Sequence, residues 1–310
     1  MSLKDIAALI VWFVLRPVVK LVPLRALYKI AGLYSIVSYV LNPGKKREIK
    51  EELKRLLPDK GADELDAIVR KGFDIYFKRM SEKLVFNDIS KEFIDANVSI
   101  EGIEHVDAAL SKGKGAVILV SHFGSFLFVP LVLTFKDYKI TQLAGGPTAA
   151  ALSPAYKIIG DSKHKETEKQ PLRFCRADVA LTEVYKVLKR NELLAVALDG
   201  RVGKNWVEVE MFGRKAMLLP GPVRIAMKSR APIIMAFMIR NEDDTQRLVL
   251  EPSIEMHTGG NYDENVLINM RRVAEVFERY VKKYPGHYAL VLQVMRLKHK
   301  RGIIDYPLVP

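Results

Sequence analysis

Short apolar runs alternate with amphipathic segments from about residue 100 onward, and this alternation constrains the fold more than any other feature. The run 116–120 follows a turn rich in lysine and glycine, which is typical of a buried strand. Strands are expected over residues 116–120, 139–143, 193–198, 232–239 and 247–250, and helices over 126–135, 176–190, 220–229 and 263–284. This order predicts an α/β fold with a mainly parallel central sheet flanked by helices.

The first part of the chain has a different character. Residues 45–66 are charged and indicate a helical segment with a turn at 58–61, and residues 63–85 carry apolar side chains on one helical face. The residues before them are both apolar and basic. We therefore divide the chain into N-terminal membrane-associated helices, residues 1–47, and an α/β domain, residues 48–310.

The charge of the chain is strongly basic, with 49 Lys and Arg against 36 Asp and Glu and a net charge of +13. Residues 1–47 and 279–301 each carry +7, so the remainder is close to neutral. Such an excess predicts an anionic partner. Because the N-terminal excess lies in an apolar segment and the sequence has no base-reading motif, an anionic membrane surface is favoured over nucleic acid.

The apolar N-terminus predicts contact with that membrane. The run Ile6–Leu15 is about half of the roughly 20 residues that a membrane span needs, and a second apolar stretch covers Leu24–Leu41. We expect two short helices, broken at Arg16-Pro17 and Val22-Pro23, that lie in the interface with Trp12 at head-group level and basic side chains on phosphates. Two alternatives remain open: a helix pair packed on the core, and a span through residues 6–24.

Cysteine chemistry contributes little to this chain. Its one cysteine, Cys175, excludes an intramolecular disulfide and a cysteine-based metal cage. We also expect no metal and no cofactor. A single buried cysteine without a basic partner is a poor nucleophile.

Two expected strands end in polar residues that are suited to chemistry. His122 follows the strand 116–120, and Asp199-Gly200-Arg201 follows the strand 193–198. Sites in parallel sheets lie at these carboxyl ends. An imidazole there can act as a general base, and an arginine can bind phosphate or carboxylate. The alternatives are a histidine bonded only to backbone and a tight Asp-Gly turn.

A further basic turn precedes a helix that begins with proline. The turn contains Gly213 and Arg214, and the helix begins near Pro220. A helix N-terminus at this place can face an anion.

Several of these motifs, taken in order, resemble the lipid A late acyltransferases, which are lauroyl and myristoyl transferases of the lysophospholipid acyltransferase superfamily. The resemblance covers about residues 100–300. The motifs that carry it are Ser121-His122-Phe123-Gly124, Asp199-Gly200-Arg201, Met211-Phe212-Gly213, Leu219–Ala226, Ala231–Ile234, Leu250–Glu255, Phe277–Val281 and Tyr284–Tyr288. It implies an O-acyltransferase that moves a fatty acyl chain from acyl carrier protein or coenzyme A to a hydroxyl of a lipid A-like lipid or glycolipid. The charge of +7 over the apolar N-terminal segment further predicts a place on the cytoplasmic face of the inner membrane.

The resemblance also implies roles for individual residues. His122 would be the general base, and the substrate-binding residues would be Phe123, Gly124, Ser125, Arg201, Gly213 and Arg214. Family members carry an acid five positions after the histidine, where this chain has Leu127. Because strands 116–120 and 193–198 are expected to be close in one sheet, we predict that Asp199 replaces this acid.

Other functions remain as alternatives. The absence of an acid at Leu127 favours a degenerate family member that binds a lipid or a partner without turnover. A thioester hydrolase lacks a supporting nucleophile motif, and a nucleic-acid binder rests on net charge alone. The apolar run 126–133 has two readings, an acyl-binding trough or ordinary core.

Overall fold

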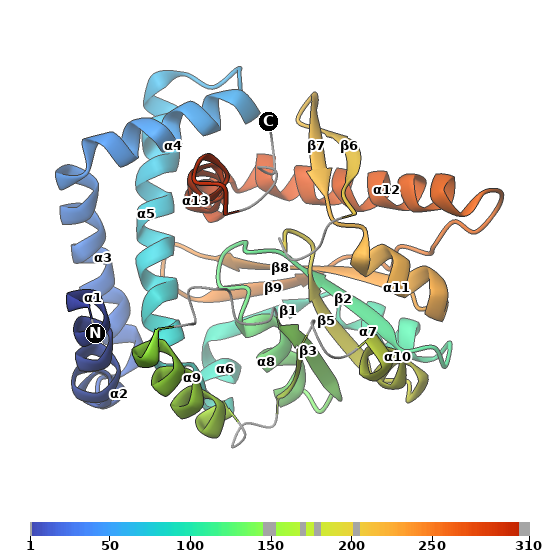
Figure 1. Ribbon diagram of the computed structural model, residues 1–310, viewed down its shortest axis with the longest axis horizontal. Coiled ribbons are helices and arrows are strands. Elements are labelled where there is room, and N and C mark those ends of the chain that lie inside the picture. Colours follow the sequence, from blue (N-terminus) through green and yellow to red (C-terminus); the bar gives the residue numbers. More distant parts are fainter. Residues whose placement is uncertain (1, 145–152, 168–171, 177–180, 201–204, 304–310) are drawn as a thin grey trace.

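The computed structural model describes residues 2–144, 153–167, 172–176, 181–200 and 205–303 (Figure 1). Its centre is a seven-stranded sheet in the order β1-β9-β8-β2-β5-β3-β4. The strands are β1 Val98–Glu101, β2 Ala116–Val120, β3 Ile140–Ala144, β4 Arg173–Arg176, β5 Leu193–Ala197, β8 Ile233–Arg240 and β9 Gln246–Leu250. Strands β8, β2, β5, β3 and β4 are parallel, and β9 pairs antiparallel with β8. The predicted α/β class with a mainly parallel sheet is confirmed.

Helices cover both faces of this sheet (Figure 1). They are α3 Leu24–Leu41, α4 Pro43–Leu56, α5 Ala62–Val85, α6 Lys91–Asn97, α7 Ile103–Leu110, α8 Phe128–Phe135, α9 Pro154–Thr167, α10 Leu181–Lys189, α11 Gly221–Ser229, α12 Tyr262–Lys283 and α13 Ala289–Lys300. Alternate residues of β2 enter two apolar cores, Val117 and Leu119 on one face and Ile118 and Val120 on the other. All five residues of β2 are buried, as the continuous apolar run predicts.

The N-terminal helix does not break where the sequence suggested. The chain is helical from α1, Leu3–Ile10, through a π-helical turn, Val11–Leu15, into α2, Arg16–Lys20. The expected break at Arg16-Pro17 is therefore wrong. Pro17 lacks an N–H and its ring would collide with the carbonyl four residues earlier, and the wider π turn just before it accommodates the ring. The expected break at Pro23 is confirmed, because α3 begins directly after it.

A two-stranded antiparallel hairpin stands apart from the main sheet. It consists of β6 Val207–Met211 and β7 Arg214–Leu218 and packs on α12 (Figure 1). The residue pattern predicted only a basic turn here. The turn is present at Phe212 and Gly213, and the two flanking strands were missed. The short strands β1 and β4 were also missed.

Candidate active site

Strands β2 and β5 are neighbours, and the two candidate catalytic residues follow them. Val120 pairs with Ala197, and the Leu198 N–H donates to the Val120 carbonyl oxygen at 2.7 Å. His122 and Asp199 each stand two residues beyond this pair. Because the strands are parallel and in register, both side chains emerge at the same edge of the sheet.

The Asp199 carboxylate lies within hydrogen-bond distance of the His122 ring. Nδ1 of His122 is 2.9 Å from Oδ1 of Asp199, and the His122 backbone N–H donates to both carboxylate oxygens at 3.0 and 3.2 Å. A carboxylate only accepts, so Nδ1 carries the proton and Nε2 keeps its lone pair. The His122 side chain is 41% exposed and the Asp199 side chain 0%. The geometry is that of a base with a buried orienting acid.

Tyr288 completes the surroundings of this carboxylate. It lies between the 3-10 turn Pro285–His287 and α13, and its hydroxyl donates to Oδ2 of Asp199 at 2.7 Å. Burial alone would raise the pKa of Asp199, but the charge of His122 and hydrogen bonds from His122 and Tyr288 lower that pKa to about 2. Asp199 is therefore a carboxylate at neutral pH.

The turn after His122 is fixed by close packing. Phe123 is 1% exposed and stacks on His287 with 5.0 Å between ring centroids. Gly124 has φ +52°, and a Cβ there would lie 2.1 Å from the Met238 carbonyl oxygen, so only glycine fits. Ser125 is fully buried. Their side-chain positions lie away from solvent, so any contribution to substrate binding would be indirect.

A buried ion pair supports this turn from behind. Arg240, the last residue of β8, pairs with Glu82 of α5, and both side chains are 1% exposed. Ser125 Oγ donates to Oε1 of Glu82 at 2.8 Å, and the Arg240 Nη2 donates to Ser125 Oγ at 3.1 Å. The hydroxyl of Tyr28 in α3 also donates to Glu82, at 3.0 Å. One network thus joins α3, α5, β8 and the His122 turn.

His287 adds a second contact to β8. Its Nε2 accepts the Arg240 backbone N–H at 2.9 Å, and its carbonyl oxygen accepts the Gly124 N–H at 3.1 Å. Burial, together with the nearby positive charges of Lys71 and Arg240, lowers the pKa of His287 to about 3. His287 is therefore a neutral structural residue at pH 7.

Arg79 of α5 also reaches the His122 turn. Its Nη1 donates to the His122 carbonyl oxygen at 3.0 Å. Its guanidinium lies over the rings of Tyr76 and Phe126, at 5.5 and 5.7 Å from their centroids. The Phe126 ring in turn lies 4.7 Å from the His122 ring. Arg79 was not among the predicted site residues.

The remaining predicted substrate-binding residues lie elsewhere. Arg201 falls outside the described residues. Gly213 and Arg214 are exposed at the turn of the β6–β7 hairpin, which packs on α12. Their roles stay predictions.

Most of the apolar run 126–133 is ordinary core. Residues 128–133 are buried in the core beneath the sheet, so they supply no open acyl trough. Cys175 lies in β4, and burial raises the pKa of its thiol, which agrees with a poor nucleophile.

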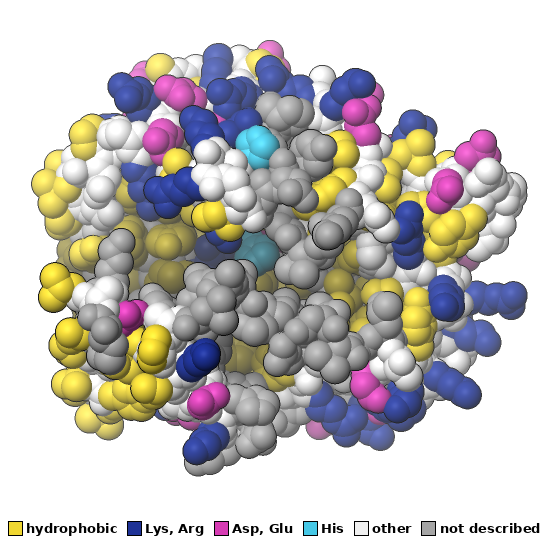
Figure 2. Space-filling view, in the orientation of Figure 1, with side chains coloured by type: hydrophobic (Ala, Val, Ile, Leu, Met, Phe, Trp, Pro, Cys, Tyr) yellow, Lys and Arg dark blue, Asp and Glu magenta, His cyan; other side chains and the backbone are white. Residues whose placement is uncertain are grey.

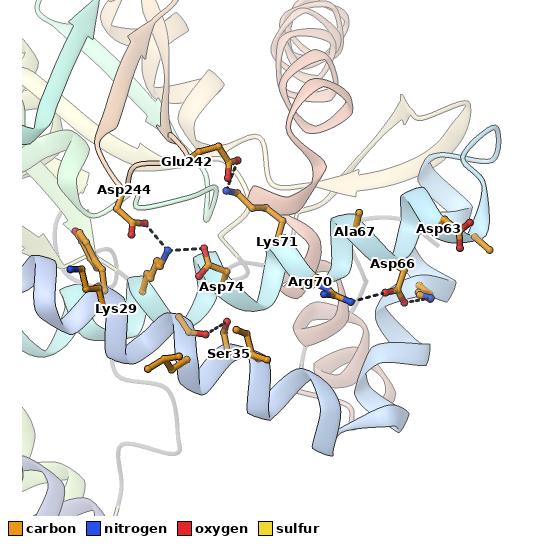
Figure 3. Close-up of a pocket in the computed structure, with 17 residues that line it drawn as sticks. Lys29, Ser35, Asp63, Asp66, Ala67, Arg70, Lys71, Asp74, Glu242 and Asp244 are labelled. Atoms are coloured by element: carbon orange, nitrogen blue, oxygen red, sulfur yellow. Dashed lines mark hydrogen bonds and ion pairs between the residues drawn. The ribbon is translucent and has the colours of Figure 1, made fainter.

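A groove of about 1060 Å³ lies on another part of the surface, between α3 and α5 (Figure 3). Its charges are balanced and largely paired: Lys78 lies 3.0 Å from Asp74 and 2.7 Å from Asp244, and Lys71 lies 2.8 Å from Glu242. None of the predicted site residues lines it.

The N-terminal helices expose an unusually apolar surface. Of the 20 large hydrophobic residues that are exposed in the described chain, 16 lie between Leu3 and Leu41. Figure 2 shows hydrophobic side chains gathered on the side where Figure 1 places α1 to α3. By length and composition alone, α3 could also cross a membrane. Patches of this kind mark membrane or protein contacts.

Two polar side chains of this N-terminal segment, Arg16 and Trp12, have partners within the protein. Arg16 is 4% exposed and binds Glu166 of α9 with two hydrogen bonds, at 2.6 and 2.7 Å. The Trp12 Nε1 donates to Ser162 Oγ at 3.1 Å. The hydrogen bond from Arg16 lowers the pKa of Glu166 to about 2, so the pair is charged. Arg16 is therefore not among the basic side chains that are free for lipid phosphates, since a carboxylate already accepts from its donors.

Comparison with known proteins matches nearly the whole chain to one family. The model of that family, bacterial lipid A biosynthesis acyltransferase, matches residues 2–298. A phosphatidylinositol mannoside acyltransferase of Mycobacterium tuberculosis (strain H37Rv) is 22% identical over 199 residues, which is 63% of this chain and 62% of that protein. A lipid A biosynthesis acyltransferase of Haemophilus influenzae is 21% identical over 214 residues, 67% of this chain and 62% of that protein. The aligned region thus spans 62% of the length of either relative.

Proposed function

We propose a function from the premise that the chain belongs to the bacterial lipid A biosynthesis acyltransferase family. In this proposal the protein moves a fatty acyl chain from a thioester to a hydroxyl of a lipid or glycolipid. The family supports acyl transfer to a lipid acceptor. We further propose acyl carrier protein or coenzyme A as the carrier of the thioester. The observation that carries the proposal is the half-exposed His122 with Asp199 on its Nδ1.

His122 is the general base in this proposal. The lone pair of Nε2 removes the proton of the acceptor hydroxyl while the hydroxyl oxygen attacks the thioester carbonyl carbon. The tetrahedral intermediate then breaks its C–S bond, and the leaving thiolate takes the proton from the imidazolium. Asp199 holds the ring in the productive tautomer and stabilises its positive charge. No acyl-enzyme forms.

The position of Leu127 favours a second candidate, a protein that binds lipid without turnover. The acid that the family places there is absent. Against that reading, Asp199 supplies a buried carboxylate at 2.9 Å from Nδ1, and the imidazole is open to solvent. Both features support the acyltransferase over the lipid-binding candidate.

Acyl transfer is tested by incubating the protein with palmitoyl-coenzyme A or palmitoyl-acyl carrier protein and a bacterial lipid extract, followed by mass spectrometry of the lipids. In this assay we expect His122→Ala to lower transfer by at least about 10²-fold, which is the usual size of a general-base contribution. The matched control is His105→Ala, which changes a histidine in α7. Near-normal turnover in a folded His122→Ala protein would remove this residue from the mechanism.

We also propose that the apolar surface of α1 to α3 places the enzyme on the cytoplasmic face of the inner membrane. The net charge of +7 over residues 1–47 adds attraction to anionic lipids. Lys20 is one of these cations, although it already lies 3.1 Å from Asp88.

The membrane proposal predicts weaker lipid binding when exposed apolar residues of α3 become polar. The triple variant Leu33→Gln, Val37→Gln and Val40→Gln changes residues that are 68, 51 and 66% exposed. We expect its partitioning into anionic vesicles to fall at least about tenfold, because burial of each such side chain contributes on the order of 1.5 kcal/mol or more.

The control for this experiment is Tyr262→Gln, which alters an exposed apolar residue of α12. Substitution is a cleaner test than removal of residues 1–41, because removal would also take Tyr28 from the buried network. Unchanged co-sedimentation of the triple variant with vesicles would contradict the proposal.

A further inference from the structure

Two cations beside the candidate active site lack a carboxylate partner among the described residues. Arg79 donates one hydrogen bond, to the His122 carbonyl oxygen, and its buried Nε has no hydrogen-bond partner within the described chain. Lys45 of α4 likewise forms no described ion pair, and its Nζ lies over the rings of Phe73 and Tyr76. Both cations therefore lie over the ring of Tyr76, Lys45 at 5.1 Å and Arg79 at 5.5 Å from its centroid.

The carboxylates closest to these cations already have partners. Glu82 is bound by Arg240, and Asp199 is bound by His122 and Tyr288. Glu48, which acts electrostatically on Lys45, accepts a hydrogen bond from Gln293 at 2.7 Å. Arg79 and Lys45 thus share one aromatic ring, and neither forms an ion pair with a carboxylate among the described residues.

Partial burial makes this arrangement costly unless an anion joins it. Both residues are partly buried, and burial lowers the pKa of Arg79 and of Lys45. The ring face of an aromatic residue offsets part of that cost but does not neutralise the charge. By contrast, Arg240, Arg16 and Lys78, the cations that are classed with the buried residues, each pair with a carboxylate.

We infer that Arg79 and Lys45, which both lie over the Tyr76 ring, form a binding site for a phosphate ester of a substrate beside His122. A guanidinium offers parallel N–H donors that match phosphate geometry, and an ammonium adds a second charge for a dianion. The contact between Arg79 and the His122 carbonyl ties this site to the turn that holds the base. The inference rests on the proposed function, because it assigns the phosphate to one of the two substrates.

The phosphate has two possible sources, and one binding experiment separates them. Coenzyme A and pantetheine form a pair with and without phosphate on the donor side. Dihexanoylphosphatidic acid and dihexanoylglycerol form the corresponding pair on the acceptor side. Calorimetric titration of the full-length protein with each probe measures how strongly phosphate favours binding, and it needs no turnover.

We expect the wild-type protein to bind the phosphate-bearing member of at least one pair more tightly than the other member. We expect that each of the variants Arg79→Gln and Lys45→Gln reduces this preference at least about tenfold. A preference for coenzyme A assigns the site to the donor, and a preference for phosphatidic acid assigns it to the acceptor. Lys45→Gln touches no atom of the His122 turn, so it separates phosphate binding from damage to the base.

The matched control is Arg70→Gln on the same helix. Arg70 also lies over an aromatic ring, that of Tyr39 at 5.1 Å, but a carboxylate, Asp66, is 3.9 Å away. This variant should keep the wild-type preference. The inference is overturned if the wild-type protein shows no preference within either pair, or if both variants keep it. Loss of acyl transfer with a retained phosphate preference would instead count against the proposed function alone.

Discussion

Asp199→Asn is expected to lower the turnover number by about 10³- to 10⁴-fold with the fold intact. The amide can present N–H groups to Nδ1 of His122, which favours the wrong tautomer and removes the charge that stabilises the imidazolium; the equivalent change in a serine-protease triad costs about 10⁴. Initial rates of acyl transfer measure the effect, and circular dichroism checks the fold. Because the pKa of Asp199 is about 2, the loss should persist across the ordinary assay range.

The matched control for this change is Asp107→Asn. Asp107 also accepts a hydrogen bond from a tyrosine hydroxyl, that of Tyr138 at 2.6 Å, but it lies in α7. Its turnover should stay close to wild type. Leu127→Glu should be neutral, because Nδ1 of His122 already has a carboxylate. A fall of less than about tenfold in Asp199→Asn would make Asp199 a turn residue and favour the lipid-binding candidate.

The contact between His122 and Asp199 could be predicted from the sequence because two features coincide. Both residues follow continuous apolar runs, and such runs give strands of parallel sheets with clear ends. Parallel strands bring their carboxyl ends to one edge, so polar residues that follow them converge once the strands are adjacent. The contact was predicted without knowledge of the side chains that surround it.

Tyr288, Arg79 and Glu82 could not be found in the same way. Each reaches the site from a helix or turn that is distant in sequence from His122, and helical periodicity tells only that one face is buried. Periodicity does not tell which strand end that face meets. Lys78 and Glu82, for example, both lie buried on one side of α5 yet bind different partners.

Local signals account for the other differences. Apolar and charged residues alternate over Val207–Met211, which is typical of a half-exposed strand and would have predicted the hairpin. Only the basic turn beside it was interpreted. Pro17 normally ends a helix, and a π turn that accommodates it leaves no mark in the residue pattern. The ion pair of Arg16 could not be predicted because its partner, Glu166, is 150 residues away in the sequence.

Glu82→Gln is expected to destabilise the protein by about 3 kcal/mol, because it leaves the buried Arg240 charge with only the longer contact to Asp244, at 3.4 Å, as counter-ion. Burial would lower the pKa of Arg240, but the negative charge of Glu82 raises that pKa above its usual value, so the guanidinium stays charged. Urea unfolding in detergent, followed by circular dichroism, measures the change. The conservative side chain keeps the volume, so the loss reports on charge and not on packing.

Two further variants decide whether the buried charge is the cause. Glu242→Gln makes the same change in an exposed pair, where Glu242 is 93% exposed and 2.8 Å from Lys71, so it should alter stability little. The double variant Glu82→Leu and Arg240→Met removes both charges and should recover much of the loss, since apolar replacements of buried pairs are often neutral. It also removes the partners of Ser125, so the turn that carries His122 should loosen and acyl transfer should stay low while stability returns. Full recovery of both stability and transfer would mean that the ion pair does not position the base.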